Sequence, residues 1–439
     1  MNPTAKLSAL AVMTAIGFAS CSTDELQEVN TGEGISFTSQ VSRATPTTLS
    51  NLDGFYVYAD AAGYKHMFIK GMKATKDGAT STYLLEEKVT WPADVNQINF
   101  WAYGPLAAKD YLTPAINATT QHIHDVNVPA SYDAGGETHN DFVLTYAEAR
   151  KTPGNQVSLE FHHALSQIEL RARLGENPEE GRRVRIKGAW LVNINSKGEV
   201  QFADGLAEEY HHMSWNNLSQ PTYYGYYFDD GSEPLLSSIP APIIANTVNS
   251  DGSLQKNSSL MLIPQKLDAY SFDNSVTEIP SAHEGEATVA ETGTGAYILM
   301  LCRIETHHNT PVTEEGQAKN PAILVEGNGH THQLFPITKD SEGNMIYTAG
   351  AYGYTCVPVA VDWMPGKKYV YTLQFCGRGS GAGQYPPAVL PDVFPKDDTH
   401  INNPAADGKK PGDNVLDNEI SFKVDVLDWT PAETDIKAN

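Results

Sequence analysis

Basic residues, cysteines and long apolar runs are all scarce in this chain of 439 residues. Its 30 lysines and arginines stand against 53 acidic residues, which gives a formal net charge of -23. Binding to nucleic acid requires a basic face that neutralises phosphates, and an anionic lipid surface makes a similar demand. The charge therefore argues against both kinds of partner and suits a soluble secreted protein.

No apolar run reaches the roughly 18–20 residues that a membrane-spanning helix needs. The run at residues 7–18 follows Lys6 and is separated from Cys21 by two small residues. A basic residue, a short apolar run and small residues before a cysteine are typical of a lipoprotein export signal. We therefore expect residues 1–20 to be a signal peptide and Cys21 to carry lipid. Because Phe18 stands where leucine is usual, an ordinary secretion signal with an incidental cysteine remains the alternative.

Three cysteines remain once Cys21 is set aside: Cys302, Cys356 and Cys376. An odd number cannot form a complete disulfide framework. Each lies in an apolar, strand-like segment, so we expect small buried hydrophobic side chains. Whether Cys356 pairs with Cys376 is left open.

The composition favours β-structure with many turns. Tyrosine (21), glycine (35) and proline (26) are plentiful, and long helix-forming runs are missing. Apolar and polar residues alternate in short segments, for example at 54–59, 97–103 and 157–162. This period of two between turn residues predicts an all-β fold of sandwich type.

The length exceeds what one hydrophobic core usually supports, so we expect two domains. A polar run at residues 175–181 ends the first block of strand-like segments. The predicted domains are an N-terminal sandwich at 44–180 and a C-terminal sandwich at 181–439. The second includes residues 377–418, which are rich in Gly, Pro, Asp and Asn and are expected to form a flexible linker.

Both ends of the chain carry a strand-like segment with alternating apolar residues. In the leader these residues are Ile35, Phe37 and Val41, and they are followed by Arg43 and Ala44. An arginine between a strand and a polar loop is a candidate cleavage site, although an ordinary surface arginine is the alternative.

At the other end the alternating residues are Ile420, Phe422, Val424 and Val426. This strand could pair with another molecule or fold back onto its own domain, and the pattern leaves both open.

Several segments in order along the chain resemble fimbrillin-family (Mfa-like) subunits of type V fimbriae. The segments that carry the resemblance are the lipoprotein leader with residues 35–45, and residues 55–59, 89–92, 98–105, 141–143, 159–168, 262–265, 365–373 and 428–429. The resemblance implies two tandem transthyretin-like Greek-key β-sandwich domains. It also implies export as a lipoprotein, cleavage after an arginine by a surface protease, and polymerisation by strand exchange.

Applied to this chain, the resemblance implies that a cut between Arg43 and Ala44 removes the lipidated leader, residues 21–43. Loss of its strand would leave unpaired backbone groups and empty pockets that a strand of the next subunit can fill. Residues 420–426 are the candidate donor strand. The expected location is the outer membrane, through the lipid on Cys21, and then a surface fimbrium. The expected partners are other fimbrial subunits, the protease and a host glycan or protein.

The sequence offers little catalytic or metal-binding chemistry. His330 and His332 share one strand face, but no cysteine or acid stands between them or directly beside them in sequence to complete a site. His162 and His163 would face opposite sides of a strand, and the pairs at 211–212 and 307–308 are expected in polar loops. Residues 377–383 are glycine-rich but lack the Lys-Ser/Thr ending of a phosphate loop. We therefore expect no enzyme, no cofactor and no metal site.

The aromatic run at residues 223–228 has two interpretations. It is either a surface that stacks on glycans or a strand whose rings pack on both faces, and packing is favoured. The leading hypothesis is a structural subunit of a surface fimbria that supports adhesion. The alternative is a monomeric surface lipoprotein that binds glycans or host proteins.

Overall fold

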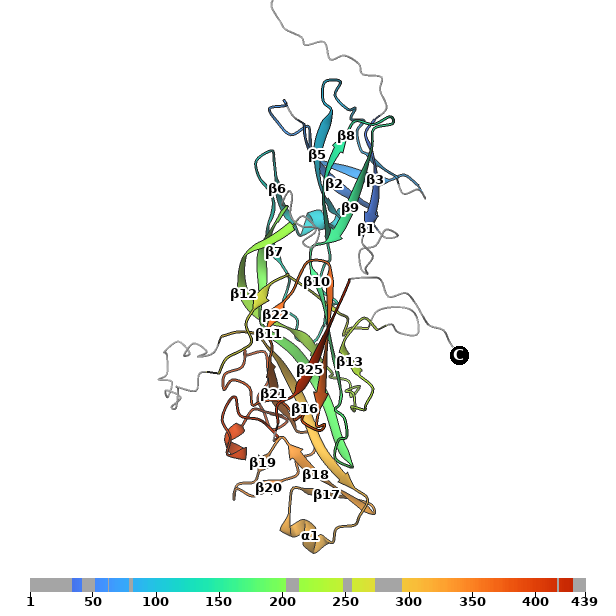
Figure 1. Ribbon diagram of the computed structural model, residues 1–439. Helices are drawn as coiled ribbons and strands as arrows, with labels where there is room; N and C mark the ends of the chain where they lie inside the picture. Colours follow the sequence, from blue (N-terminus) through green and yellow to red (C-terminus); the bar gives the residue numbers. More distant parts are fainter. Residues whose placement is uncertain are drawn as a thin grey trace, which may run out of the picture.

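The computed structural model is an elongated, all-β molecule (Figure 1), as the alternating pattern predicts. It describes residues 34–41, 52–61, 63–78, 82–202, 213–247, 255–272, 294–416 and 418–428. The helices within these ranges are short: η1 (Leu106–Asp110), α1 (Glu314–Lys319) and η3 (Pro404–Asp407). Of the helices described, none has the length and apolar character to cross a membrane.

The first sheet closes into a barrel at the upper end of the molecule in Figure 1. Apolar residues alternate in these strands, so one face of each fills a common core around Phe55, Phe100 and Phe161. The strands in barrel order are β1 (Ser36–Val41), β4 (Thr82–Leu85), β3 (Ile69–Lys76), β2 (Gly54–Ala61), β5 (Gln97–Gly104), β8 (Val143–Arg150) and β9 (Gln156–His163).

The second sheet has five strands and ends at the last strand of the described chain. Its central pair, β10 and β23, runs parallel, with residues 167–174 beside residues 368–375. The order is β13 (Ala241–Ile244), β10 (Ser166–Leu174), β23 (Lys367–Phe375) and β25 (Ser421–Asp428), with β14 (Leu260–Leu262) also paired to β10.

The third sheet has nine strands and is built on the long strand β11 (Arg182–Phe202). From one edge it runs β17 (Ile323–Glu326), β18 (Gly329–Phe335), β16 (Tyr297–His308), β11, β7 (Gln121–Asn127) and β6 (Thr113–Ile116). Branching from it are β12 (Met213–Tyr227), β21 (Tyr352–Pro358) and β24 (His400–Ile401). Two small sheets pair β15 (Lys266–Leu267) with β22 (Val361–Asp362), and β19 (Thr338–Lys339) with β20 (Met345–Ile346).

The second and third sheets share the largest core. Ile168 of β10 and Leu373 of β23 lie in one buried cluster with Ile186 of β11 and Met300 of β16. Strands β7 and β10 precede residue 181, and they pair with β11 and β23, which follow it. The two larger sheets therefore draw strands from both sides of residue 181.

The segment at residues 377–418 is packed against the fold, so the prediction of a flexible linker is wrong. Tyr385, Leu390 and Phe394 in it are buried, and Gln384 bridges the backbone of Cys356. These apolar anchors are few and irregularly spaced, so no periodic pattern reveals them. Turns such as the one at Asp397, whose carboxylate accepts from the backbone N–H groups of residues 399 and 400, satisfy the irregular backbone.

The three cysteines within the described residues are free. Cys302 and Cys356 are buried among apolar side chains, which confirms the prediction for these two. Cys376 is only partly buried, and burial raises the pKa of its thiol to about 11.

Candidate functional site: the first and last strands

Strand β1 completes the barrel by lying between two strands that are distant in sequence (Figure 1). On one side it runs parallel to β9, with Ser36 opposite Gln156 and Val41 opposite Phe161. On the other side it runs antiparallel to β4, with Phe37 opposite Tyr83. Strand β1 therefore supplies the ladder partners of both neighbours.

The inward side chains of this segment belong to the barrel core. Ile35 is 3% exposed and Phe37 is fully buried. The Phe37 ring meets Phe55 and Phe100 edge-on, with centroid distances of 6.0 and 5.7 Å. Val41 pairs through its backbone with Phe161, and its side chain lies outside the described part.

Loss of β1 would open this barrel along a defined groove. The edges of β4 and β9 would lose their ladder partners, and the pockets of Ile35 and Phe37 would be vacated. Unpaired strand edges bind other strands readily. Each large side chain returned to such a pocket is worth roughly 1.5–3 kcal/mol.

The candidate donor strand, β25, occupies the outer edge of the five-stranded sheet. Its eight residues pair antiparallel with β23, from Ser421 opposite Gln374 to Asp428 opposite Lys367. The ion pair between Lys367 Nζ and Asp428 Oδ1, at 2.7 Å, holds its far end. In this structure the last strand is therefore folded back onto its own sheet.

Strand β25 keeps much of its apolar surface exposed despite this pairing. Phe422 is 37% exposed and Val426 is 56% exposed, while Val424 is half-buried. Ile420, just before the strand, is buried. A strand held mainly by its backbone, with apolar side chains in solvent, has more to gain from a deeper groove.

The entry to β25 is held against the segment at residues 380–381. The Gly381 N–H donates to the Glu419 carbonyl, and the Ser421 N–H donates to Ser380 Oγ. A Cβ on Gly381 would lie 1.7 Å from the Asn418 carbonyl oxygen, so only glycine fits there. Release of a segment that begins at Ile420 would therefore have to break these two hydrogen bonds.

The predicted lipidation and processing residues, Cys21, Arg43 and Ala44, lie outside the described residues. The leader residues Ile35 and Phe37 lie in the barrel, as given above. Of the expected donor residues, Phe422, Val424 and Val426 share one face of β25.

The histidines are arranged in ways that the sequence shows only in part. His163 is buried and its Nδ1 lies 2.8 Å from Asp141 Oδ2, while His162 points to the other side of β9. The expectation of a loop at 307–308 is wrong, because both residues end strand β16. This strand brings His308 beside His330 and His332. The contact could not be seen in the sequence, because His308 lies more than 20 residues before the other two. The pair at 211–212 lies outside the described residues.

The aromatic run lies at the end of β12 and packs on both faces, which confirms the favoured interpretation. Tyr224, Tyr226 and Phe228 are buried in the largest core. On the other face, Tyr223 and Tyr227 pack with Tyr132, Trp190 and Phe394 in a separate aromatic cluster. Most of this ring surface is therefore used inside the molecule.

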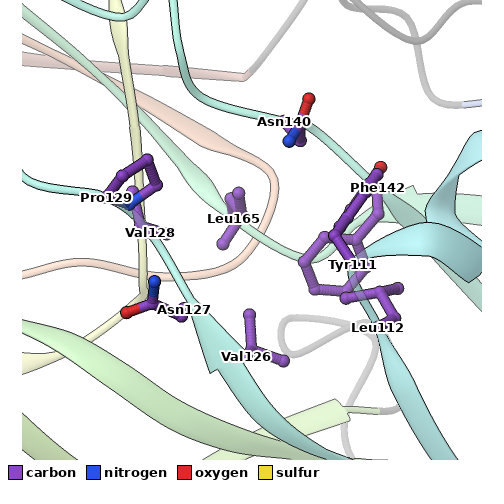
Figure 2. A pocket seen from close by; sticks show the side chains of 9 residues that line it. All are labelled: Tyr111, Leu112, Val126, Asn127, Val128, Pro129, Asn140, Phe142 and Leu165. Carbon is purple, nitrogen blue, oxygen red and sulfur yellow. The ribbon is translucent and has the colours of Figure 1, made fainter.

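A small pocket lies beside the start of β10 (Figure 2). Figure 2 shows Tyr111, Leu112 and Phe142 on one side and the segment from Val126 to Pro129 on the other, with Leu165 between them. Its volume of about 30 Å³ would hold one or two waters. Ligand pockets are typically several hundred Å³, so this one is too small for an organic ligand.

The comparisons with known proteins agree with the all-β architecture and the resemblance. The family model described as "Fimbrillin-like" matches residues 42–292. The chain belongs to the fimbrillin-like family. The match covers more than half of the chain, including strands of all three large sheets.

The solved structures that this chain matches include proteins from Bacteroides species. A fimbrial protein from Bacteroides vulgatus shares 15% identity with this fimbrillin-like chain, with a TM-score of 0.50, over 91% of this chain and 100% of the other. A proposed cell adhesion protein from Bacteroides eggerthii shares 12% identity, with a TM-score of 0.38, over 91% of this chain and 98% of the other. At 15% identity the first likeness concerns the fold alone. No curated protein sequence matches the chain.

Proposed function

We propose that this fimbrillin-like chain is a structural subunit of a cell-surface fimbria and has no catalytic activity of its own. It is exported with lipid on Cys21 and held at the outer membrane. A surface protease cuts between Arg43 and Ala44, and the subunit then polymerises by strand exchange. The partners are further fimbrial subunits, and the assembled fimbria supports adhesion.

The observation that carries the proposal is the position of β1. It lies before the proposed cut, yet it supplies the ladder between β4 and β9 and buries Ile35 and Phe37 in the barrel core. A removable segment at such a place keeps the barrel closed until it is cut. The proposed cut therefore couples release from the lipid to opening of the groove.

The sequence of β25 and of the residue before it supports this strand as the one that replaces β1. Residues 35–37 and residues 420–422 both read Ile-Ser-Phe, and in each segment a valine follows the isoleucine by six positions. Alternate residues of a strand face the same side. If the donated strand runs in the same direction as β1, Ile420 and Phe422 would enter the pockets of Ile35 and Phe37. Val426 would then take the position of Val41.

The exchange gives a filament rather than a closed ring. The groove lies in the barrel at one end, and β25 pairs with β23 in the other part of the molecule (Figure 1). Donation from one subunit to a different surface of the next is heterologous, and such contacts propagate when the rotation does not close.

We also propose the finer description of the fold. The chain comprises tandem transthyretin-like Greek-key units, 44–180 and 181–439, which correspond mainly to the barrel and to the pair of larger sheets. Strands β7 and β10 cross between the two parts, since they pair with β11 and β23.

The test is the state of the protein on the cell surface. N-terminal sequencing of assembled fimbriae should give Ala44, and the material should form high-mass ladders on denaturing gels without boiling. The variant Arg43→Ala should retain the leader and form no ladder, while the control Arg150→Ala, at an exposed arginine of β8, should assemble normally. Assembled fimbriae that retain residues 21–43 would contradict strand exchange at this groove.

A further inference from the structure

Strand β16 ends and strand β18 begins far from the barrel (Figure 1). Three imidazole rings converge at this place. His308 lies directly opposite His330 in the antiparallel pairing, and His332 follows two residues later on the same face of β18. The ring centroids are 5.0 Å apart for His308 and His330, 5.2 Å for His308 and His332, and 4.8 Å for His330 and His332. One ring nitrogen from each lies within 4.8 Å of the other two.

One of these rings is already oriented as metal-binding histidines usually are. His330 Nδ1 lies 2.6 Å from the backbone carbonyl oxygen of Thr310. A carbonyl only accepts, so Nδ1 carries the hydrogen and the lone pair of the neutral ring is on Nε2. In metal sites the second nitrogen of a histidine typically donates to a carbonyl or carboxylate in this way.

The cluster has no anionic partner among the described residues. His307, one position away on β16, lies 3.2 Å from the Glu326 carboxylate, but none of His308, His330 and His332 forms such a pair. Imidazoles without an anionic partner are good ligands for borderline transition metals.

We propose that His308, His330 and His332 together bind one Zn²⁺ ion through their ring nitrogens. Strand register supplies the three ligands, and the exposed side of His308 leaves the fourth position open to water or to an incoming group. The site does not depend on strand exchange, because β1, β4 and β9 contribute nothing to it.

A second group of His122, His124 and Glu199 provides an internal comparison. Here the Nδ1 atoms of His122 and His124 already lie 3.0 and 2.6 Å from the two Glu199 carboxylate oxygens. These polar groups satisfy one another without an ion, so they carry no metal proposal and serve as a control.

The experiment is calorimetric titration of the full chain with ZnCl₂, using protein purified without a histidine tag and stripped with a chelator. We expect one ion per chain. His308→Asn, at the exposed ring, should weaken binding by at least about 10-fold, because even outer partners of metal sites are worth 10-fold or more. His332→Asn should behave in the same way.

Two matched variants define the outcome. His307→Asn removes the adjacent histidine, which faces the other side of the hairpin, and Glu199→Gln breaks the second group; both should bind Zn²⁺ as the natural chain does. Zn²⁺ should also raise the unfolding temperature of the natural chain and not that of His308→Asn. Absence of Zn²⁺ binding, or equal affinity in His308→Asn and the natural chain, would overturn the site.

Discussion

The ring of Phe37 stands edge-on to the ring of Phe100, with centroids 5.7 Å apart and planes at 80°. Phe100 belongs to β5 of the barrel, while Phe37 belongs to β1, in the leader that the proposed protease would remove. Edge-to-face pairs contribute beyond the burial of their area. A residue that the proposed cut would remove is thus part of the barrel core.

Replacing Phe37 should therefore destabilise the uncut chain strongly. Phe37→Ala empties a fully buried site, which typically costs 3–5 kcal/mol. Urea unfolding followed by tryptophan fluorescence measures the loss, since Trp91 also packs on Phe100. Ser36→Ala, on the outward face of the same strand, should change the free energy of unfolding by less than about 0.5 kcal/mol. Equal stability of Phe37→Ala and the natural precursor would contradict the role assigned to this ring.

A substitution on the exposed face of β25 should impair assembly without affecting the stability of the monomer. Val426 is 56% exposed, so Val426→Asp should change the free energy of unfolding of the monomer by less than about 0.5 kcal/mol. In a neighbour's groove the same carboxylate would be buried without a partner, so polymers should be lost. Ladder formation on denaturing gels reports assembly, and Ile239→Asp, at a 74% exposed site elsewhere, is the control. Normal ladders from Val426→Asp would contradict donation by this strand.

Local alternation in the sequence predicts some of the strands. Strand β9 shows why: Val157, Leu159 and Phe161 are buried while the residues between them are exposed or half-buried. The same pattern marked β1 and the segment that becomes β25. It contains nothing about partners, so the parallel pairing of β1 with β9 could not be predicted.

The parts that sequence reasoning missed depend on contacts between distant residues. His308 and His330 are far apart in sequence and meet only through the register of β16 and β18. The packed segment around Leu390 and Phe394 was mistaken for a linker, because its composition is that of a loop and its few anchors follow no period. Register and irregular packing are set by the whole fold rather than by local pattern.

A buried carboxylate on β10 should stabilise the five-stranded sheet. Glu169 is 1% exposed; burial alone would raise its pKa, but Lys368, Arg171 and Ser259 hold the pKa of this carboxyl below its usual value. Lys368 Nζ lies 2.7 Å from Oε1 and Arg171 Nη2 lies 2.9 Å from Oε2. A depressed pKa means that this stabilisation is complete above the unfolded value, about 4.3, and is lost as pH falls through the folded value.

Glu169→Gln should therefore lower the free energy of unfolding at pH 7 by about 1.5–3 kcal/mol, the usual value of hydrogen bonds to a charged group, because Lys368 and Arg171 stay partly hydrated. As pH falls below the unfolded value, the difference from the natural chain should shrink, because the carboxyl of the unfolded chain takes up a proton before that of the folded chain does. Urea unfolding at pH 7 and at a pH below the unfolded value measures this. The control is Glu160→Gln, at an exposed position of β9, which should have little effect at either pH. A difference that did not change with pH would contradict the ionised state of Glu169.

A buried histidine should make the fold sensitive to mild acid. Burial lowers the pKa of His139 to about 4, and its Nδ1 accepts a hydrogen bond of 3.1 Å from the Met261 N–H. In the unfolded chain the pKa is about 6.5. Between these values the unfolded state binds a proton that the folded state does not, so stability falls as pH falls from 6.5 towards 4.

From pH 7 to pH 5 this one group should remove about 2 kcal/mol from the free energy of unfolding. His139→Asn keeps an acceptor for the Met261 N–H but cannot be protonated in this range. The variant should therefore lose about 2 kcal/mol less than the natural chain between pH 7 and pH 5. Urea unfolding at pH 7 and pH 5 gives the comparison, with His66→Asn, at an exposed histidine, as the control. If His139→Asn lost as much stability on acidification as the natural chain, the acid sensitivity would have to come from other groups.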